Sequence, residues 1–168
     1  ELAIDLLNNR IKKFPKDKDA LTLLSILHSD TSSNNNYFNS ELAENFFKKI
    51  MNLYPHDPQV YYNFGKHKQN LSEYTEAIDL YEQGLQLTSN SDQSYYNMGF
   101  CSMQLQEYSQ AIEYFTNAIN IDKSFLLAYH ARAYVYDLMD KPEKSITDWK
   151  NCLMLNPSYI PALEALSK

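Results

Sequence analysis

Residues 60–69 of the chain read VYYNFGKHKQ, and residues 94–103 read SYYNMGFCSM. The string Tyr-Tyr-Asn-x-Gly begins at Tyr61 and again at Tyr95, 34 residues later. A period between about 20 and 50 residues is typical of proteins built from repeated supersecondary units. The fold therefore depends on how far along the chain this period extends.

The period extends over three consecutive segments. The positions shared by the first two are Leu71 with Leu105, Tyr74 with Tyr108, and Ala77 with Ala111, and the third adds Tyr129, Ala133, Trp149 and Pro157. The segment before them, residues 18–57, follows the same pattern with six additional residues. These fall in the polar stretch 29–40, whose Ser, Asn and Asp side chains are typical of a loop.

Each repeat has the residue spacing of two α-helices. Tyr61 and Gly65 fall on one face of a helix, and Ala77 and Tyr81 do so after a break at residues 70–73. Small residues at repeated positions, such as Gly65, indicate that the two helices pack closely. With only 3 glycines and 6 prolines in 168 residues, the chain also lacks the turn residues that many short strands require. The sequence predicts an all-α fold of antiparallel helix hairpins.

This pattern resembles the tetratricopeptide repeat (TPR) over the whole chain, most strongly from Tyr61 to Ala118. The resemblance implies a right-handed superhelical solenoid of helix hairpins. On its register the chain is a single array made of residues 1–17 (second helix of a repeat), 18–57 (a repeat with the insertion in loop 29–40), 58–91, 92–125 and 126–159 (three repeats), and 160–168 (the start of a further or capping helix). Because the chain opens inside a repeat and begins with Glu1, we expect it to be a piece of a longer protein.

Charge and hydropathy argue against two classes of partner. A net charge of −6 at pH 7 does not suit a general nucleic-acid binder, which needs a basic face. The basic cluster Lys12, Lys13, Lys16 and Lys18 is interleaved with aspartates, and we interpret it as a solvated helix end and turn. No run of apolar residues has the length of a membrane span, so we expect no membrane contact within these residues.

The sequence predicts no catalytic residue, no cofactor and no metal site, and therefore no enzyme. The glycines are too far apart for a phosphate-binding loop, and neither a Gly-x-Ser-x-Gly nor a His-Glu-x-x-His motif is present. His67 is expected at the surface, and His130 is the one histidine expected to touch a ligand. Cys101 and Cys152 lack Cys-x-x-Cys spacing, which favours a reducing compartment such as the cytoplasm and leaves the localisation unknown.

The resemblance to TPR proteins implies a protein-protein interaction scaffold whose first helices line a concave groove for a peptide or partner segment. A helix advances about 100° per residue, so Tyr62 and Lys66 lie on a different stripe from the packed residues Tyr61 and Gly65. The matching positions predict a binding groove made of Tyr62, Asn63, Lys66, Tyr96, Asn97, Phe100, Met103, His130 and Tyr134. Aromatic side chains are expected to supply apolar contacts, and the two asparagines hydrogen bonds to a partner's backbone.

Other interpretations stay open. The groove aromatics can simply pack on one another, with the asparagines following the family pattern whether or not anything binds. The array can be an architectural spacer, can self-associate through exposed terminal helices, or can be an accessory domain of an enzyme. In loop 29–40, Tyr37 and Phe38 are expected either in a disordered insertion or in a segment that folds over the groove. Lys66 is the single cation at the positions where related arrays clamp an acidic C-terminus, so we expect that clamp to be absent.

Overall fold

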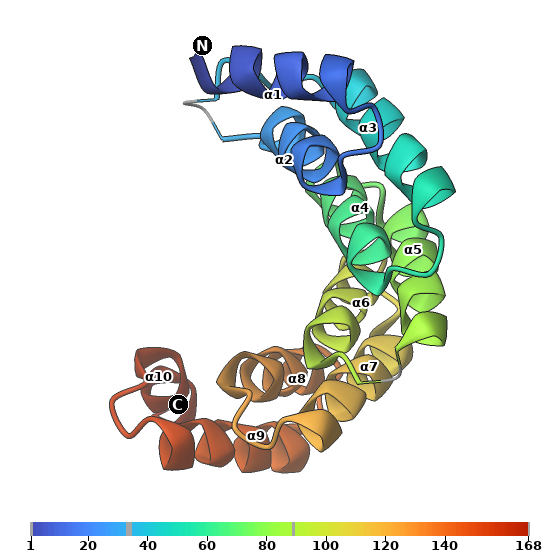
Figure 1. The fold of residues 1–168 in the computed structure, drawn as a ribbon. Coiled ribbons are helices and arrows are strands. Elements are labelled where there is room, and N and C mark those ends of the chain that lie inside the picture. Colours follow the sequence, from blue (N-terminus) through green and yellow to red (C-terminus); the bar gives the residue numbers. More distant parts are fainter. Residues whose placement is uncertain (1, 33–34, 89, 168) are drawn as a thin grey trace. The chain divides into compact units, whose positions relative to one another are not determined.

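The described part of the chain consists of α-helices joined by turns and, between Ser29 and Ser40, by a longer loop (Figure 1). The structure is a computed structural model that describes residues 2–32, 35–88 and 90–167. In these residues the helices are α1 (Leu2–Lys13), α2 (Lys18–Ser29), α3 (Ser40–Leu53), α4 (Pro58–Asn70), α5 (Tyr74–Leu87), α6 (Asp92–Gln104), α7 (Tyr108–Ile121), α8 (Leu126–Leu138), α9 (Pro142–Leu155) and α10 (Ile160–Leu166). The predicted all-α fold is confirmed.

The helices pair into hairpins within two compact units. The N-terminal unit spans Glu1–Thr88 and contains the hairpins α2/α3 and α4/α5, preceded by α1. The C-terminal unit spans Ser89–Lys168 and contains α6/α7 and α8/α9, followed by α10. In each unit the first helices of successive hairpins are neighbours, α2 beside α4 and α6 beside α8. These first helices therefore form one face of their unit.

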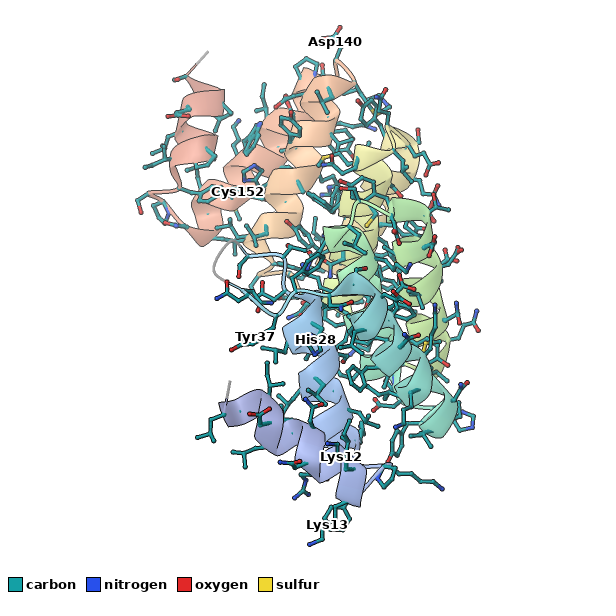
Figure 2. The ribbon with its side chains drawn as sticks, turned by 90° about the horizontal axis from the view of Figure 1, so that it is seen from above. Lys12, Lys13, His28, Tyr37, Asp140 and Cys152 are labelled. Carbon is teal, nitrogen blue, oxygen red and sulfur yellow. The ribbon has the colours of Figure 1, made fainter. Side chains whose placement is uncertain are left out.

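The turns inside the hairpins α4/α5, α6/α7 and α8/α9 each contain one residue with a left-handed backbone. Ser72, Gln106 and Asp140 have φ of 62°, 61° and 52° and stand at equivalent positions of three repeats. Figure 2 shows Asp140 at the tip of the turn between α8 and α9. A side chain in this region is strained by about 1 kcal/mol or more, because its Cβ crowds the following carbonyl oxygen. The sequence did not indicate this geometry, since none of the three residues is glycine.

The repeated small residues make room for an aromatic ring of their own hairpin. A Cβ atom added to Gly65 would lie 2.8 Å from the Tyr81 ring, and one added to Gly99 would lie 2.6 Å from the Phe115 ring. Both rings are fully buried and come from the second helix of the same hairpin. The ring therefore approaches the bare backbone of the first helix, a more specific reason for glycine than close approach of two backbones.

The expectation that His67 lies at the surface is wrong, because its side chain is only 1% exposed. It lies on α4 against the ring of Phe47, with a centroid separation of 5.7 Å. Burial lowers the pKa of His67, which favours the neutral imidazole. The equivalent residues Cys101 and Val135 are also buried. Their apolar character is the sequence signal that would have placed His67 in the core.

The described part of loop 29–40 is tied to the end of α2, in contrast to a disordered insertion. His28 Nδ1 lies 2.6 Å from the carbonyl oxygen of Tyr37, so this nitrogen carries the proton and donates. The Asn35 side chain donates to the carbonyl oxygens of Leu27 and Asp30 at 2.7 and 2.8 Å. Figure 2 shows His28 and Tyr37 close together at this end of α2. Residues 33 and 34 of the loop lie outside the described residues.

Candidate partner-binding surface

Three of the predicted groove residues occupy one repeat position and pack on the core aromatic of their own hairpin. Tyr62 lies 5.8 Å from the Tyr81 ring, Tyr96 lies 5.8 Å from the Phe115 ring, and His130 lies 5.1 Å from the Trp149 ring, measured between centroids. Each of the three side chains is half-buried. One side of each ring therefore packs inside its own hairpin. These contacts would be present whether or not a partner binds.

In the C-terminal unit this position makes a second aromatic contact. Tyr96 lies 5.1 Å from the Phe125 ring, and His130 lies 5.6 Å from the ring of Tyr159, one repeat later. His130 Nδ1 is also 2.5 Å from the Tyr159 hydroxyl. Burial lowers the pKa of His130, so its imidazole is held neutral between two rings. His130 therefore takes part in packing, and its role in binding stays a prediction.

At a second repeat position, that of Gln69, Met103 and Asp137, the first-helix residue is polar where the core aromatic has a hydrogen-bond donor and apolar where it has none. The Tyr81 hydroxyl donates to Gln69 Oε1 at 2.8 Å, and Trp149 Nε1 donates to Asp137 Oδ2 at 3.0 Å. Where the aromatic is Phe115, which has no polar atom, the equivalent first-helix residue is Met103, and it packs in the same apolar cluster. Met103, predicted to face a partner, thus contributes mainly to the hairpin core.

The two asparagines differ from each other. Asn63 is half-buried and accepts a hydrogen bond from Gln59 Nε2 at 2.9 Å. Asn97 is only 5% exposed, so the prediction that it lies on an exposed stripe is wrong. The equivalent Ala131 packs against the cluster of Phe115 and Val135, which indicates that this position of the first helix turns toward neighbouring helices.

A further position carries the most outward-facing of the predicted residues. In the C-terminal unit Tyr134 on α8 is 47% exposed and the equivalent Phe100 on α6 is half-buried, while Leu127, about two turns before Tyr134, is 49% exposed. In the N-terminal unit Lys66 on α4 is exposed, and so are Leu23 and Ile26 on α2. We call these residues the first-helix surface of each unit.

The same helices carry little free charge. In α6 and α8, Arg132 is the single lysine or arginine, and it is held by Asp148. Its Nε and Nη2 atoms donate to the two Asp148 oxygens at 2.7 and 2.8 Å, and its Nη1 donates to Thr116 Oγ1 at 2.8 Å. Burial opposes the charged form, but the Asp148 carboxylate outweighs it and raises the pKa of Arg132. The first-helix surface of the C-terminal unit is therefore aromatic and uncharged.

The family model of the tetratricopeptide repeat matches residues 58–91 and residues 93–125. Residues 58–91 and 93–125 are therefore tetratricopeptide repeats. The TPR hairpins of the structure extend on both sides of the matched residues, and the fold class is the all-α helical-repeat solenoid. A sequence comparison with curated proteins found no match.

Solved structures with the same fold include MamA, whose crystal structure has a TM-score of 0.80 at 21% identity, covering 95% of this TPR chain and 90% of the MamA chain. Another is the Cut9-Hcn1 hetero-tetramer of APC/C, with a TM-score of 0.76 at 21% identity, covering 99% of this chain and 32% of the other. A third is the first TPR of Spaghetti (RPAP3) bound to the HSP90 peptide SRMEEVD, with a TM-score of 0.63 at 22% identity and coverages of 66% and 88%.

Searches for other kinds of site gave two negative findings. Across residues 2–32, 35–88 and 90–167, no group of three or more His, Cys, Asp or Glu side chains is arranged to hold a metal ion. Within the same ranges, no helix is both long and apolar enough to cross a membrane.

Proposed function

We propose that this TPR array is a protein-interaction scaffold whose first helices bind an extended segment of a partner protein. The observation that carries the proposal is the exposure of Tyr134 and Leu127 on α8, with the half-buried Phe100 at the position of Tyr134 on the neighbouring helix α6. Neither Tyr134 nor Leu127 belongs to the apolar clusters that hold the hairpins together. Neighbouring large apolar side chains that remain exposed are typical of a surface that a partner covers.

The proposed segment is apolar rather than acidic. Its side chains would contact Phe100, Leu127 and Tyr134, and α6 and α8 offer no unpaired lysine or arginine to hold a carboxylate. The Spaghetti TPR was solved with the HSP90 peptide SRMEEVD, which carries several carboxylates. Lys66 in the N-terminal unit is the single cation of the first-helix surfaces, so we do not propose that peptide as the ligand.

Most of the other predicted groove residues pack against the core beneath the first-helix surfaces and contribute to these surfaces only indirectly. Tyr62, Tyr96, Met103 and His130 pack on the core aromatics and fix the rotation of the first helices. Asn63 is the remaining amide from which a partner's backbone can receive a hydrogen bond. The proposed contact residues are therefore Phe100, Leu127 and Tyr134 in the C-terminal unit and, separately, Lys66 in the N-terminal unit.

A pull-down with two matched double variants tests the proposal. Leu127→Ala with Tyr134→Ala removes two apolar side chains from the first-helix surface, and Ile146→Ala with Met154→Ala removes two exposed ones from the second helix α9. Partners captured by the unaltered protein should be lost from the first double variant and kept by the second. Equal capture by both double variants, with helical content unchanged, would overturn the proposal.

A second candidate function is architectural, through contacts between copies of the array. The helices at both ends expose apolar side chains, including Leu2 and Leu6 on α1 and Ile160 and Leu163 on α10. Sedimentation velocity of the Leu6→Glu, Leu163→Glu variant tests it. A loss of oligomers that the unaltered protein forms would support this function, and a monomer in both cases would exclude it.

A further inference from the structure

Cations from two distant parts of the chain gather around the turn between α1 and α2. Lys12 and Lys13 end α1, and Lys16 lies in the turn that follows. Lys48 and Lys49 come from α3, much later in the sequence, and all five side chains are exposed. Figure 2 shows Lys12 and Lys13 at the end of α1. We call these five lysines, together with Arg10, the basic turn surface.

Two hollows open within this surface and share Pro15 and Lys16. The first has a volume of about 530 Å³ and is lined also by Arg10, Lys13, Phe14 and Asp17. The second, of about 480 Å³, is lined also by Asn45, Lys48, Lys49, Asn52 and Leu53. Cationic side chains therefore line these hollows together with the apolar side chains of Phe14, Pro15 and Leu53.

The turn that separates the hollows is held in place. The backbone N–H of Asp17 donates to the carbonyl oxygen of Phe14 at 3.0 Å, and the Tyr54 hydroxyl donates to the carbonyl oxygen of Lys16. The Asp17 side chain also caps α2 by accepting from the Ala20 N–H at 2.9 Å. A surface fixed in this way loses little conformational entropy when it binds, which favours recognition.

The positive charge of this surface is only partly neutralised. Arg10 is paired with Asp17 at 2.6 Å and Lys48 with Glu44 at 2.9 Å. Lys12, Lys13, Lys16 and Lys49 have no ion pair with the part of the chain that the structure describes. The surface is therefore positive on a chain whose net charge is −6, and complementary charge on a partner would direct it here.

We propose that the basic turn surface binds an acidic segment of a partner protein that also carries apolar residues. Its apolar side chains occupy the two hollows, its carboxylates lie against Lys13, Lys16 and Lys49, and the Asn45 and Asn52 amides reach its backbone. This chemistry favours a polypeptide over a nucleic acid, because the phosphate backbone would extend beyond the few lysines onto an acidic protein. The site lies on α1, α3 and the turn, apart from the first-helix surfaces.

Fluorescence anisotropy with a labelled 12-residue peptide of Glu and Leu tests this proposal. Lys16→Glu with Lys49→Glu reverses two unpaired cations, and Lys123→Glu with Lys150→Glu makes the same charge change on exposed lysines of the C-terminal unit. The first double variant should weaken binding by about tenfold or more, since it turns two attractive contacts into repulsive ones, and the second should change it little. A neutral variant, Lys16→Gln with Lys49→Gln, repeats the test if the reversed one fails to fold.

Two further probes decide between classes of ligand. Replacing every Glu of the peptide by Gln should abolish binding, and Leu127→Ala with Tyr134→Ala in the protein should leave it unchanged, which separates this site from the first-helix surface. Equal binding of the Glu and Gln peptides, or an equal effect of the two lysine pairs, would overturn the proposal. Tighter binding of a 12-nucleotide DNA strand or of phosphatidylserine vesicles than of the Glu peptide would also overturn it.

Discussion

Arg132 and Asp148 form a bidentate ion pair. In the repeat 58–91 the equivalent residues are Phe64 and Leu80, which lie in one apolar cluster. The Asp148 side chain is almost fully buried, and that of Arg132 is largely so. One repeat thus replaces an apolar contact between its two helices by a charged one. Because a buried charge without a partner is strongly unfavourable, each member of the pair depends on the other.

Removing one member should therefore destabilise the protein more than removing both. Asp148→Leu should lower the free energy of unfolding by about 3 kcal/mol, because it leaves the Arg132 charge without its carboxylate. Arg132→Phe with Asp148→Leu introduces the residues that the repeat 58–91 has at these positions, Phe64 and Leu80. This double variant should lower the free energy of unfolding by less than Asp148→Leu does. Urea unfolding followed by circular dichroism measures both. If the double variant is as unstable as Asp148→Leu alone or more so, the pair is not coupled in this way.

The buried His67 predicts a pH dependence of stability. Burial lowers the pKa of His67 in the folded protein, so the unfolded chain binds more protons near and below the unperturbed value of about 6.5. The stabilisation is fully present above that pH and is lost as the pH falls through it toward the folded pKa. His67→Val, which introduces the residue of equivalent position 135, should flatten the change in unfolding free energy between pH 8 and pH 5.5. His56→Val, at an exposed turn residue, is the control for the loss of a histidine elsewhere in the same unit.

Glycines at two repeat positions should respond differently to alanine. Gly99→Ala places a Cβ atom 2.6 Å from the buried Phe115 ring and should lower the free energy of unfolding by about 1–3 kcal/mol through overpacking. A Cβ atom at Gly84 would meet its nearest neighbour, Tyr61 Cβ, at 3.3 Å, and the better helix propensity of alanine offsets the tighter contact. Thermal unfolding of both variants measures the difference. A Gly99→Ala protein as stable as the Gly84→Ala protein would contradict this account of the ring packing.

The left-handed turn residues offer a stabilising change. Gln106→Gly should raise the free energy of unfolding by about 0.5–1 kcal/mol, because glycine adopts a positive φ without the Cβ strain. Glu113→Gly, in the interior of α7, should lower it by about 1 kcal/mol, because there glycine only weakens the helix. Chemical unfolding of the two variants gives the comparison. Destabilisation by both would show that Gln106 is not strained.

The sequence predicted the helices and their pairing because the 34-residue period appears directly in the chain. It predicted the first-helix surface less well, since a stripe one residue away from the packed one is only about 100° away on the helix. The side chains of Tyr62 and Tyr96 are long enough to contact the core rings from this second stripe. The two asparagines also differ, because Asn97 is buried and Asn63 is half-buried. Tyr134 is exposed, as expected for a groove residue. Whether any of the groove residues binds a partner stays a prediction.

Other features depended on contacts that no local pattern shows. Lys48 and Lys49 come from α3 and line the same hollow as Lys16, a juxtaposition that only the folded hairpin creates. The pairing of Tyr81 with Gln69 and of Trp149 with Asp137 likewise joins two helices of one hairpin. In the sequence the residues of such a pair are separated by a turn, so their matched polarity becomes visible only when the repeats are compared position by position.

Site-specific photo-crosslinking tests the central claim, that partners bind the first-helix surface, most directly. A benzophenone amino acid replaces Tyr134 on α8 in one protein and Ile146 on α9 in another, two positions of similar exposure at 47% and 41%. Binding through the first helices predicts partner adducts from position 134 and none from position 146. Adducts from position 146 alone, or equal adducts from both positions, would contradict the account.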